Sequence, residues 1–344
     1  MSASPSPQQR LTPEQWSFLQ EALATSSALI AADHLGVLAR LAAGPADPIT
    51  IARDCAISLR GARLLLAALH SLGLIEEDAD GSYHTALSDL AQVTAWITPW
   101  GQLTQAIRDD QPARAGNTPG GAEILYPEVV AHLGAWFAPA AERAADHLVG
   151  RRLRVLDLGA GAAPWSLALA ARNPDMRVTA VDVPAVLAVT RQVVAASGYA
   201  TQFDYLSGDL FTIDLGRSAY DLAIAGNLCH LFDEATNRRL LGRLFDALRP
   251  GGTLAILDAL PNEQLDGPRP IVLYALGLLL RTNRGQVYPF STYVGWLREV
   301  GYEAVERIDL SPTPPISLIT ARRPASEGGR NGHHFQERDR KSVV

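Results

Sequence analysis

The sequence predicts an α/β fold in its C-terminal part, preceded by a mostly helical N-terminal part. Apolar runs of strand length recur after residue 150, and helix-like runs separate them. Several of these apolar runs end in an acidic or amide side chain, and the first also leads into glycines. Alternating strands and helices form parallel sheets whose carboxyl ends meet at one edge, where α/β proteins bind nucleotide-like ligands.

The clearest unit is a strand, a glycine turn, a helix and a second strand. Glycines in such a turn let the backbone approach a ligand and point its N–H groups at it. The parts are, in order, the strand Leu153–Leu158 containing Asp157, the turn with Gly159 and Gly161, a helix from Pro164, and the strand Val178–Val181 before Asp182.

Two residues of this unit indicate which ligand it binds. A dinucleotide fingerprint has a third glycine where this chain has Pro164. The carboxylate of Asp157 would repel a pyrophosphate, whereas it would attract a ligand that carries an ammonium group. The pattern therefore favours S-adenosylmethionine over a nicotinamide dinucleotide. Asp182 is expected to accept hydrogen bonds from the ribose hydroxyls.

Two later strand ends offer further contacts to the same ligand. Gly208 and Asp209 follow the third strand, where Asp209 is expected to bind an adenine amino group and Phe211 to pack on the ring. Asn227 follows the fourth strand and is expected to hold the methionyl part. A single acid also occurs as a helix cap, but acids at three successive strand ends favour a ligand site.

The rest of the C-terminal part completes the sheet. We expect a strand over 220–227, a helix over about 233–248, a strand over 253–258, an inserted apolar helix over 271–280, a helix over 291–300, and strands over 304–310 and 316–321. The proline-rich turn at 312–315 allows the last two strands to form a hairpin.

The N-terminal part has the order of a winged helix. Helical periodicity over 13–43 is followed by two short helices within 49–74 and by a hairpin that turns at Asp80–Gly81. The wing is acidic, and acidic side chains would repel nucleic-acid phosphates, so we favour a protein-interaction module over DNA binding. The wing's acids are Glu76, Glu77, Asp78 and Asp80.

Composition sets further limits. Hydrophobic residues make up 47% of the 344 residues, enough for a sizeable core, and the net charge of −6 argues against a nucleic-acid enzyme. The two cysteines indicate neither disulfides nor a thiolate metal site. No metal site is expected at His333–His334 either, because no fixed acids accompany the pair. The start lacks a signal pattern and the longest apolar run is too short for a membrane span, so we expect a soluble cytoplasmic protein.

These motifs resemble those of class I S-adenosylmethionine-dependent methyltransferases. With the winged-helix pattern, the chain over about residues 13–324 resembles the small-molecule O-methyltransferases of caffeate and hydroxyindole type. The motifs that carry the resemblance are Asp157-Leu158-Gly159-Ala160-Gly161, Asp182, Gly208-Asp209-Leu210-Phe211 and Leu248-Arg249-Pro250-Gly251-Gly252.

The resemblance implies an architecture and its partners. It implies a Rossmann-like, seven-stranded methyltransferase sheet, S-adenosyl-L-methionine as cofactor, a small-molecule acceptor, and a homodimer held by interlocking N-terminal helices. No nucleic-acid or membrane partner is implied. The expected parts are a winged-helix dimerisation domain (13–95), a helical linker lining the substrate cavity (96–150), a catalytic domain (151–324) and a disordered tail (325–344).

The resemblance also implies a catalytic base. Members of this family carry a histidine followed by Asp-Trp after the fourth strand, and His230 falls at that position with Leu231 and Phe232 after it. A histidine can remove a hydroxyl proton near neutral pH, although His230 could instead only pack at the cofactor rim. Asp258 and Glu263 are candidate acids to orient it, from their positions alone.

The expected activity is methyl transfer to a hydroxyl of a small molecule. The apolar insertion at 271–280 and Tyr288–Phe290 indicate a hydrophobic acceptor, aromatic or polyketide-like. Four aromatic residues of the linker indicate a substrate cavity, although ordinary core packing would equally explain each one taken singly. They are Trp100, Tyr126, Trp136 and Phe137. The alternatives are a C- or N-methyltransferase, a member of the fold that does not methylate, and a winged-helix transcriptional regulator.

Overall fold

The computed structural model describes residues 11–85, 97–148, 150 and 153–325 of the chain. The chain forms two compact units, residues 1–113 and 114–344, and the division falls inside the predicted linker at 96–150. The predicted disordered tail lies outside the described residues, apart from Ala325. No helix in the described ranges is both long and apolar enough to span a bilayer.

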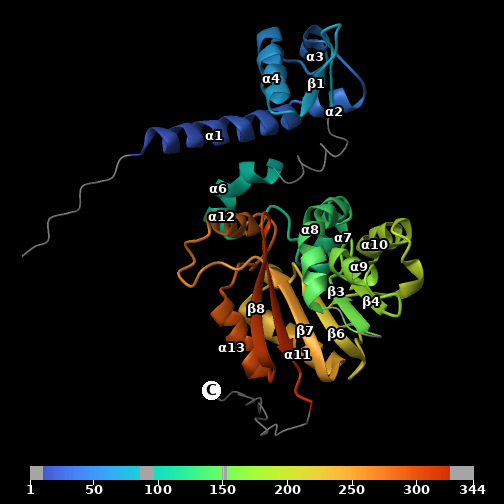
Figure 1. The fold of residues 1–344 in the computed structure, drawn as a ribbon. Helices are drawn as coiled ribbons and strands as arrows, with labels where there is room; N and C mark the ends of the chain where they lie inside the picture. The colour runs from blue at the N-terminus through green and yellow to red at the C-terminus, as the bar shows by residue number, and fades with distance from the viewer. Residues whose placement is uncertain (1–10, 86–96, 149, 151–152, 326–344) are drawn as a thin grey trace, which may run out of the picture. The chain divides into compact units, whose positions relative to one another are not determined.

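The N-terminal unit consists of helices and a short hairpin. Its elements are α1 (Pro13–His34), α2 (Val37–Ala42), α3 (Pro48–Asp54), α4 (Leu59–Ser71), β1 (Ile75–Glu77), β2 (Tyr83–Thr85), η1 (Thr98–Gln102) and α6 (Leu103–Asp109), shown in Figure 1. Side-chain caps at Thr12, Asp47 and Ser58 accept hydrogen bonds from first-turn N–H groups and begin α1, α3 and α4. The two short helices and the hairpin that the sequence predicts are therefore present.

The C-terminal unit is built on one sheet. Its elements are α7 (Pro119–Leu125), α8 (Val130–Leu148), β3 (Arg154–Leu158), α9 (Pro164–Ala170), β4 (Arg177–Asp182), α10 (Pro184–Ala196), η2 (Ala200–Gln202), β5 (Phe203–Ser207), β6 (Tyr220–Gly226), η3 (Cys229–Leu231), α11 (Glu234–Ala247), β7 (Leu248–Asp258), α12 (Arg269–Leu278), α13 (Phe290–Val300), β8 (Glu303–Pro312) and β9 (Pro315–Arg322).

The sheet has seven strands in the order β5-β4-β3-β6-β7-β9-β8. The five strands β5, β4, β3, β6 and β7 run parallel to one another, whereas β9 is antiparallel to both β7 and β8. The chain starts in the middle at β3, adds β4 and β5 on one side, and then β6 and β7 on the other. This confirms the predicted α/β fold and the predicted hairpin of the last two strands. The strand order reverses between β3 and β6, where ligands bind in such sheets.

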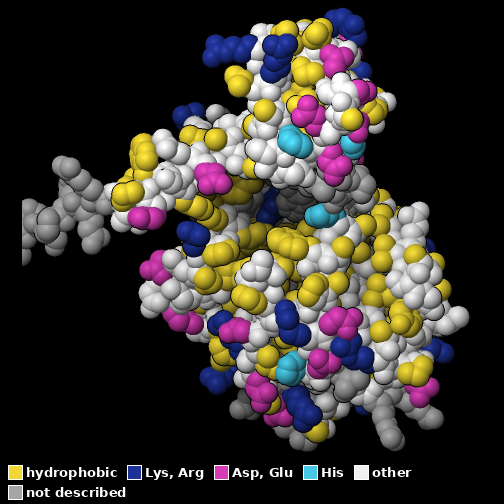
Figure 2. All heavy atoms as spheres, turned by 45° about the horizontal axis from the view of Figure 1, so that its top comes forward, with side chains coloured by type: hydrophobic (Ala, Val, Ile, Leu, Met, Phe, Trp, Pro, Cys, Tyr) yellow, Lys and Arg dark blue, Asp and Glu magenta, His cyan; other side chains and the backbone are white. Residues whose placement is uncertain are grey.

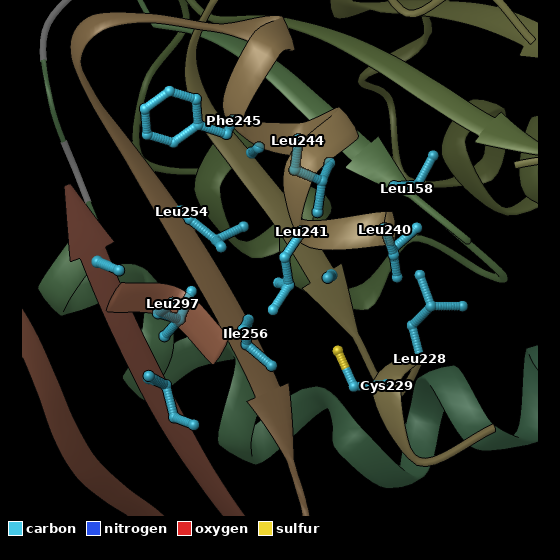
Figure 3. Close-up of a cluster of buried hydrophobic side chains, with 14 of the residues drawn as sticks. Leu158, Leu228, Cys229, Leu240, Leu241, Leu244, Phe245, Leu254, Ile256 and Leu297 are labelled. Atoms are coloured by element: carbon cyan, nitrogen blue, oxygen red, sulfur yellow. The ribbon is translucent and has the colours of Figure 1, made fainter. Parts of the chain in front are cut away.

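Helices lie on both faces of the sheet (Figure 1), and the side chains of each strand alternate between these two layers. On one face, Leu156 and Leu158 of β3 pack in a cluster with residues of α11 and α13, part of which Figure 3 shows. On the other face, Val155 packs in a cluster with residues of α8, α9 and α10. Because the side chains of a strand alternate, Asp157 shares the face of Val155 and points toward the layer that contains α9.

Candidate active site

The turn after β3 holds two glycines in the left-handed region, with φ of 70° at Gly159 and 56° at Gly161. The N–H groups of Gly159 and Ala160 donate to the Val181 carbonyl at 2.9 and 3.1 Å. The N–H of Gly161 donates to Asp182 Oδ2 at 3.0 Å. These N–H groups therefore join the turn to the end of β4 in this structure. The contact of Gly159 and Gly161 with the cofactor stays a prediction.

Asp157 lies on β3 immediately before this turn and is only 1% exposed. It accepts a hydrogen bond at 2.5 Å from the hydroxyl of Ser166 on α9. Burial raises the pKa of Asp157 to about 7, which Ser166 partly offsets and the neighbouring Asp182 reinforces. Because burial penalises the ionised carboxylate, a cationic ligand at this place would stabilise it strongly.

Asp182 is the last residue of β4, on the strand next to β3. Besides Gly161, the N–H of Val183 donates to its carboxylate at 2.8 Å. Burial raises the pKa of Asp182 to about 6, the two N–H groups lower it, and the charge of Glu123 raises it. Asp157 and Asp182 thus form a pair of acids at neighbouring strand ends.

Gly208 and Asp209 follow β5, whose last residue pairs with Asp182. One carboxylate oxygen of Asp209 accepts a hydrogen bond at 2.9 Å from the N–H of Phe211, so it stabilises the local turn. The Phe211 ring is partly buried, and its centroid lies 5.1 Å from that of Phe232 in an edge-on contact. The contacts of Asp209 and Phe211 with adenine stay predictions.

Asn227 follows β6 with a φ of 54°, and its N–H donates to the Leu257 carbonyl at 2.7 Å. Its Oδ1 is buried and accepts no hydrogen bond from the described residues. A buried acceptor without a donor costs roughly 1–3 kcal/mol, so a ligand N–H at this place would relieve that cost.

His230 lies in η3, close after β6, and is 4% exposed. Its Nδ1 is 2.6 Å from Oδ1 of Asp258, the last residue of the adjacent strand β7. The structure thus brings one of the two candidate orienting acids to His230. The other, Glu263, accepts hydrogen bonds from the hydroxyl and N–H of Ser291 instead.

Tyr274 on the inserted helix α12 contacts the other nitrogen of the same imidazole, with its hydroxyl 2.7 Å from His230 Nε2. The two rings meet edge-on at 5.2 Å. Sequence reasoning missed this residue, although it marked the apolar insertion as part of the acceptor site. The spacing of Tyr274 from His230 gives no signal, because the contact depends on how α12 packs.

The aromatic residues that the sequence analysis named differ in their burial and in their contacts. Tyr288 is 3% exposed and donates to the Phe232 carbonyl at 2.7 Å, so it belongs to the core. Trp136 is 52% exposed, and Phe137 packs on Trp165 of α9 with ring centroids 5.8 Å apart. Burial raises the pKa of Tyr126 to about 12, with smaller effects from the charges of Arg281 and Asp182. The charge of Asp182 acts on Tyr126, so this tyrosine lies near the end of β4.

Comparison with known proteins agrees with this geometry. The family described as O-methyltransferase domain matches residues 143–303. A 3-hydroxy-5-methyl-1-naphthoate 3-O-methyltransferase from Streptomyces sahachiroi is 30% identical over 331 residues, covering 89% of this chain and 94% of the relative. This chain belongs to the S-adenosylmethionine-dependent O-methyltransferases.

Two further similarities are to a C-methyltransferase sequence and to a solved methyltransferase fold. An L-tyrosine C(3)-methyltransferase from Streptomyces lavendulae is 25% identical, over 75% of this chain and 78% of the relative. The human N-acetylserotonin methyltransferase, solved in complex with S-adenosylmethionine, shares the fold with a TM-score of 0.67 at 22% identity, covering 93% of this chain and 100% of the other.

The residues of this O-methyltransferase fit its cofactor. Two buried carboxylates and one buried acceptor without a donor stand at the carboxyl ends of β3, β4 and β6, and the cofactor would bring an ammonium group and ribose hydroxyls there. Such hydrogen-bond donors would satisfy all three groups. The residues available to hold S-adenosylmethionine are Asp157, Asp182 and Asn227.

Proposed function

We propose that this enzyme methylates a hydroxyl of a small aromatic or polyketide-like acceptor, with His230 as the base. The observation that carries the proposal is the imidazole buried against Asp258 at the carboxyl end of β6 and β7. The relative that acts on a hydroxylated naphthoate supports an aromatic acceptor.

We assign the following roles to residues of this chain. Asp258 holds the imidazole by Nδ1, so that Nε2 is the nitrogen that takes up a proton. Asp157 and Asn227 would hold the amino-acid part of the cofactor, Asp182 its ribose, and Asp209 with Phe211 its adenine. When bound, S-adenosylmethionine supplies a methyl group that is already activated on a sulfonium. Positioning and proton removal are therefore the protein's main contributions.

The test is an acceptor screen read by mass. The enzyme would be incubated with S-adenosylmethionine carrying a ¹³C-labelled methyl group and with hydroxynaphthoic acids, catechol and a tetracyclic phenol. A single methyl gain with the ¹³C shift of a methoxy carbon is expected. A methyl carbon bonded to ring carbon would instead establish C-methylation, and no gain on any hydroxylated arene would contradict the proposed acceptor class.

Cofactor binding should weaken as the pH falls, because the pKa of Asp157 is raised to about 7 in the ligand-free protein. Below that pH the carboxyl must lose a proton before it can pair with an ammonium group. The dissociation constant of S-adenosylhomocysteine should therefore rise by up to about tenfold per pH unit from about pH 7 to about pH 6. Calorimetry at a series of pH values measures this slope.

The matched variant is Asp157→Asn, which keeps the shape of the side chain without its charge. Its binding should be weaker at about pH 8 and nearly independent of pH above about pH 6.5, where Asp182, with a pKa of about 6, is still ionised. An unaltered slope in this variant would show that another group causes the pH dependence.

We also propose that the N-terminal unit is a dimerisation domain that binds a second copy of this chain. Trp16, Leu19 and Leu23 share one face of α1 and are 55%, 48% and 70% exposed. Figure 2 shows hydrophobic side chains along this helix. Large exposed apolar side chains at such spacing are typical of a helix that packs on a partner.

Replacing Leu19 and Leu23 together with glutamate should convert a dimer into a monomer, which sedimentation or light scattering measures. The control is Leu64→Glu. Leu64 lies on α4 and is 62% exposed, and its replacement should leave the dimer intact. A dimer that survives the double replacement would contradict the assignment of α1.

DNA binding by the N-terminal unit is the second candidate. Arg60 and Arg63 are exposed on α4, the second of the two short helices. The acidic wing argues against it, since Glu76 and Glu77 lie on the adjacent strand β1. A salt-dependent shift of duplex DNA by the purified protein would favour this candidate.

A further inference from the structure

Both ring nitrogens of His230 are hydrogen-bonded within the protein. Nδ1 lies 2.6 Å from Asp258 and Nε2 lies 2.7 Å from the hydroxyl of Tyr274, while the whole residue is 4% exposed. A base must be within hydrogen-bond reach of the proton that it removes, either directly or through one intervening group. In this arrangement the group that stands before Nε2 is the phenol of Tyr274.

The direction of the hydrogen bonds follows from Asp258. Its carboxylate accepts from the N–H of His230 at 3.2 Å, from the N–H of Ala259 at 2.8 Å and from the hydroxyl of Tyr293 at 3.3 Å. With Asp258 as the acceptor toward Nδ1 as well, that nitrogen carries the imidazole proton. Nε2 then has a lone pair, and the hydroxyl of Tyr274 donates to it.

The phenol of Tyr274 can accept a proton from one group while it gives its own proton to Nε2 of His230. Arg281 donates a hydrogen bond to the phenolic oxygen, and the second lone pair of that oxygen can accept another while the phenol donates to Nε2. The residue is only partly buried, and the guanidinium carbon of Arg281 lies 5.1 Å from the centroid of its ring. Burial raises the pKa of Tyr274, and the charge of Arg281 offsets part of that rise. A positive charge at this place stabilises negative charge that develops on the phenolic oxygen during proton transfer.

We propose that Tyr274 relays the proton of the acceptor hydroxyl to His230. The acceptor's O–H bond breaks and its proton bonds to the oxygen of Tyr274, while Tyr274's own proton moves to Nε2 of His230. The acceptor keeps the electron pair as an oxyanion, Tyr274 ends neutral, and His230 becomes an imidazolium beside the carboxylate of Asp258. The proposal rests on the proposed function, in which His230 is the final base.

Tyr274 could instead only occupy the place of the acceptor hydroxyl, and this role predicts a different effect of Tyr274→Phe on the rate of methylation. If Tyr274 only fills the place of the acceptor hydroxyl and moves away when the acceptor binds, its loss should leave kcat/KM unchanged or raise it. The relay instead predicts that Tyr274→Phe lowers kcat by about 100-fold or more, close to the effect of His230→Asn. The double variant should then be no slower than the slower single variant, since both residues serve one transfer.

The experiment measures methylation of 3-hydroxy-2-naphthoic acid, and of 4-nitrocatechol as an acceptor that ionises at lower pH. If the relay operates, both Tyr274→Phe and His230→Asn should methylate the ionised nitrocatechol at close to the wild-type rate, because this acceptor has no proton to lose. The control is Tyr302→Phe, which removes another buried hydroxyl, the donor to the Leu241 carbonyl at 3.2 Å. This control should keep the wild-type rate with both acceptors.

A second readout needs neither cofactor nor acceptor. In ¹⁵N spectra of the imidazoles, the His230 signals are assigned by their loss in His230→Asn, and Tyr274→Phe should shift the Nε2 signal toward that of a nitrogen without a donor. If Tyr274→Phe does not fold, 3-fluorotyrosine at position 274 keeps the shape and changes the acidity of the phenol. In the relay it should change kcat with 3-hydroxy-2-naphthoic acid but not with the ionised nitrocatechol.

The outcomes separate the two proposals. A full rate in His230→Asn would overturn the proposed role of His230 as base. A slow His230→Asn with a fast Tyr274→Phe, or a fluorotyrosine variant whose kcat is unchanged with both acceptors, would overturn the relay alone.

Discussion

His230→Asn is expected to lower kcat by about 100- to 10,000-fold, the usual contribution of a general base. The asparagine amide can still donate a hydrogen bond to Asp258, which lies 2.6 Å from Nδ1 in the wild-type protein, so the surrounding packing is retained. What the variant lacks is a nitrogen that takes up a proton. The dissociation constant of S-adenosylhomocysteine should stay within about threefold of the wild-type value, because the acids that we propose to hold the cofactor lie on β3 and β4.

The measurements are the single-turnover rate with an acceptor from the screen and calorimetric cofactor binding. His147→Asn is the matched control, because His147 is exposed in the last turn of α8 and should not affect either quantity. An unchanged rate in His230→Asn would assign His230 to packing. Loss of cofactor affinity together with the rate would place it at the cofactor rim instead.

The fold could be predicted from the sequence because its signals are local. Apolar runs that end in polar residues mark β3 to β7, and the registers bring those ends together, with Asp182 opposite Ser207 and Gly226 opposite Leu257. One difference shows the limit of local patterns. Arg249–Gly252 was expected to separate a helix from the next strand, yet β7 already begins at Leu248, which pairs with Tyr220. Pairing with a neighbouring strand decided this boundary, and pairing is a long-range property.

The candidate site also has residues that the sequence indicates and residues that only the tertiary structure reveals. Asp157, Asp182 and Asn227 could be found because each stands at a strand end, and the order of strands then places them at one edge. Asp258 also stands at a strand end, but its contact with His230 depends on the loop after β6. Tyr274 had no such signal, since the face of α12 that meets His230 is set by tertiary packing. The direction of the N–H groups of Gly161 and Gly159 depends on hydrogen bonds to β4, which the glycine spacing does not show.

Asp182→Ala is expected to weaken the binding of S-adenosylhomocysteine by at least about 100-fold, or ~2.7 kcal/mol. The carboxylate has two roles that the replacement removes together. It accepts the N–H of Gly161 at 3.0 Å and of Val183 at 2.8 Å, which fixes the glycine turn against β4. It would also accept the ribose hydroxyls of the cofactor. Calorimetry with the purified variant measures the loss of affinity.

Two further variants separate these roles. Asp182→Asn keeps one oxygen that can accept the N–H of Gly161, but its NH2 group cannot accept the N–H of Val183. It should therefore fold with somewhat lower thermal stability than the wild type and still bind poorly. Asp204→Ala, at an exposed position on β5, is the control and should bind normally. Tight binding by Asp182→Ala would refute the ribose assignment. Poor binding by Asp182→Asn at a temperature where the variant is folded would support it, because the contact to Gly161 can be kept while an acceptor for the ribose hydroxyls is lost.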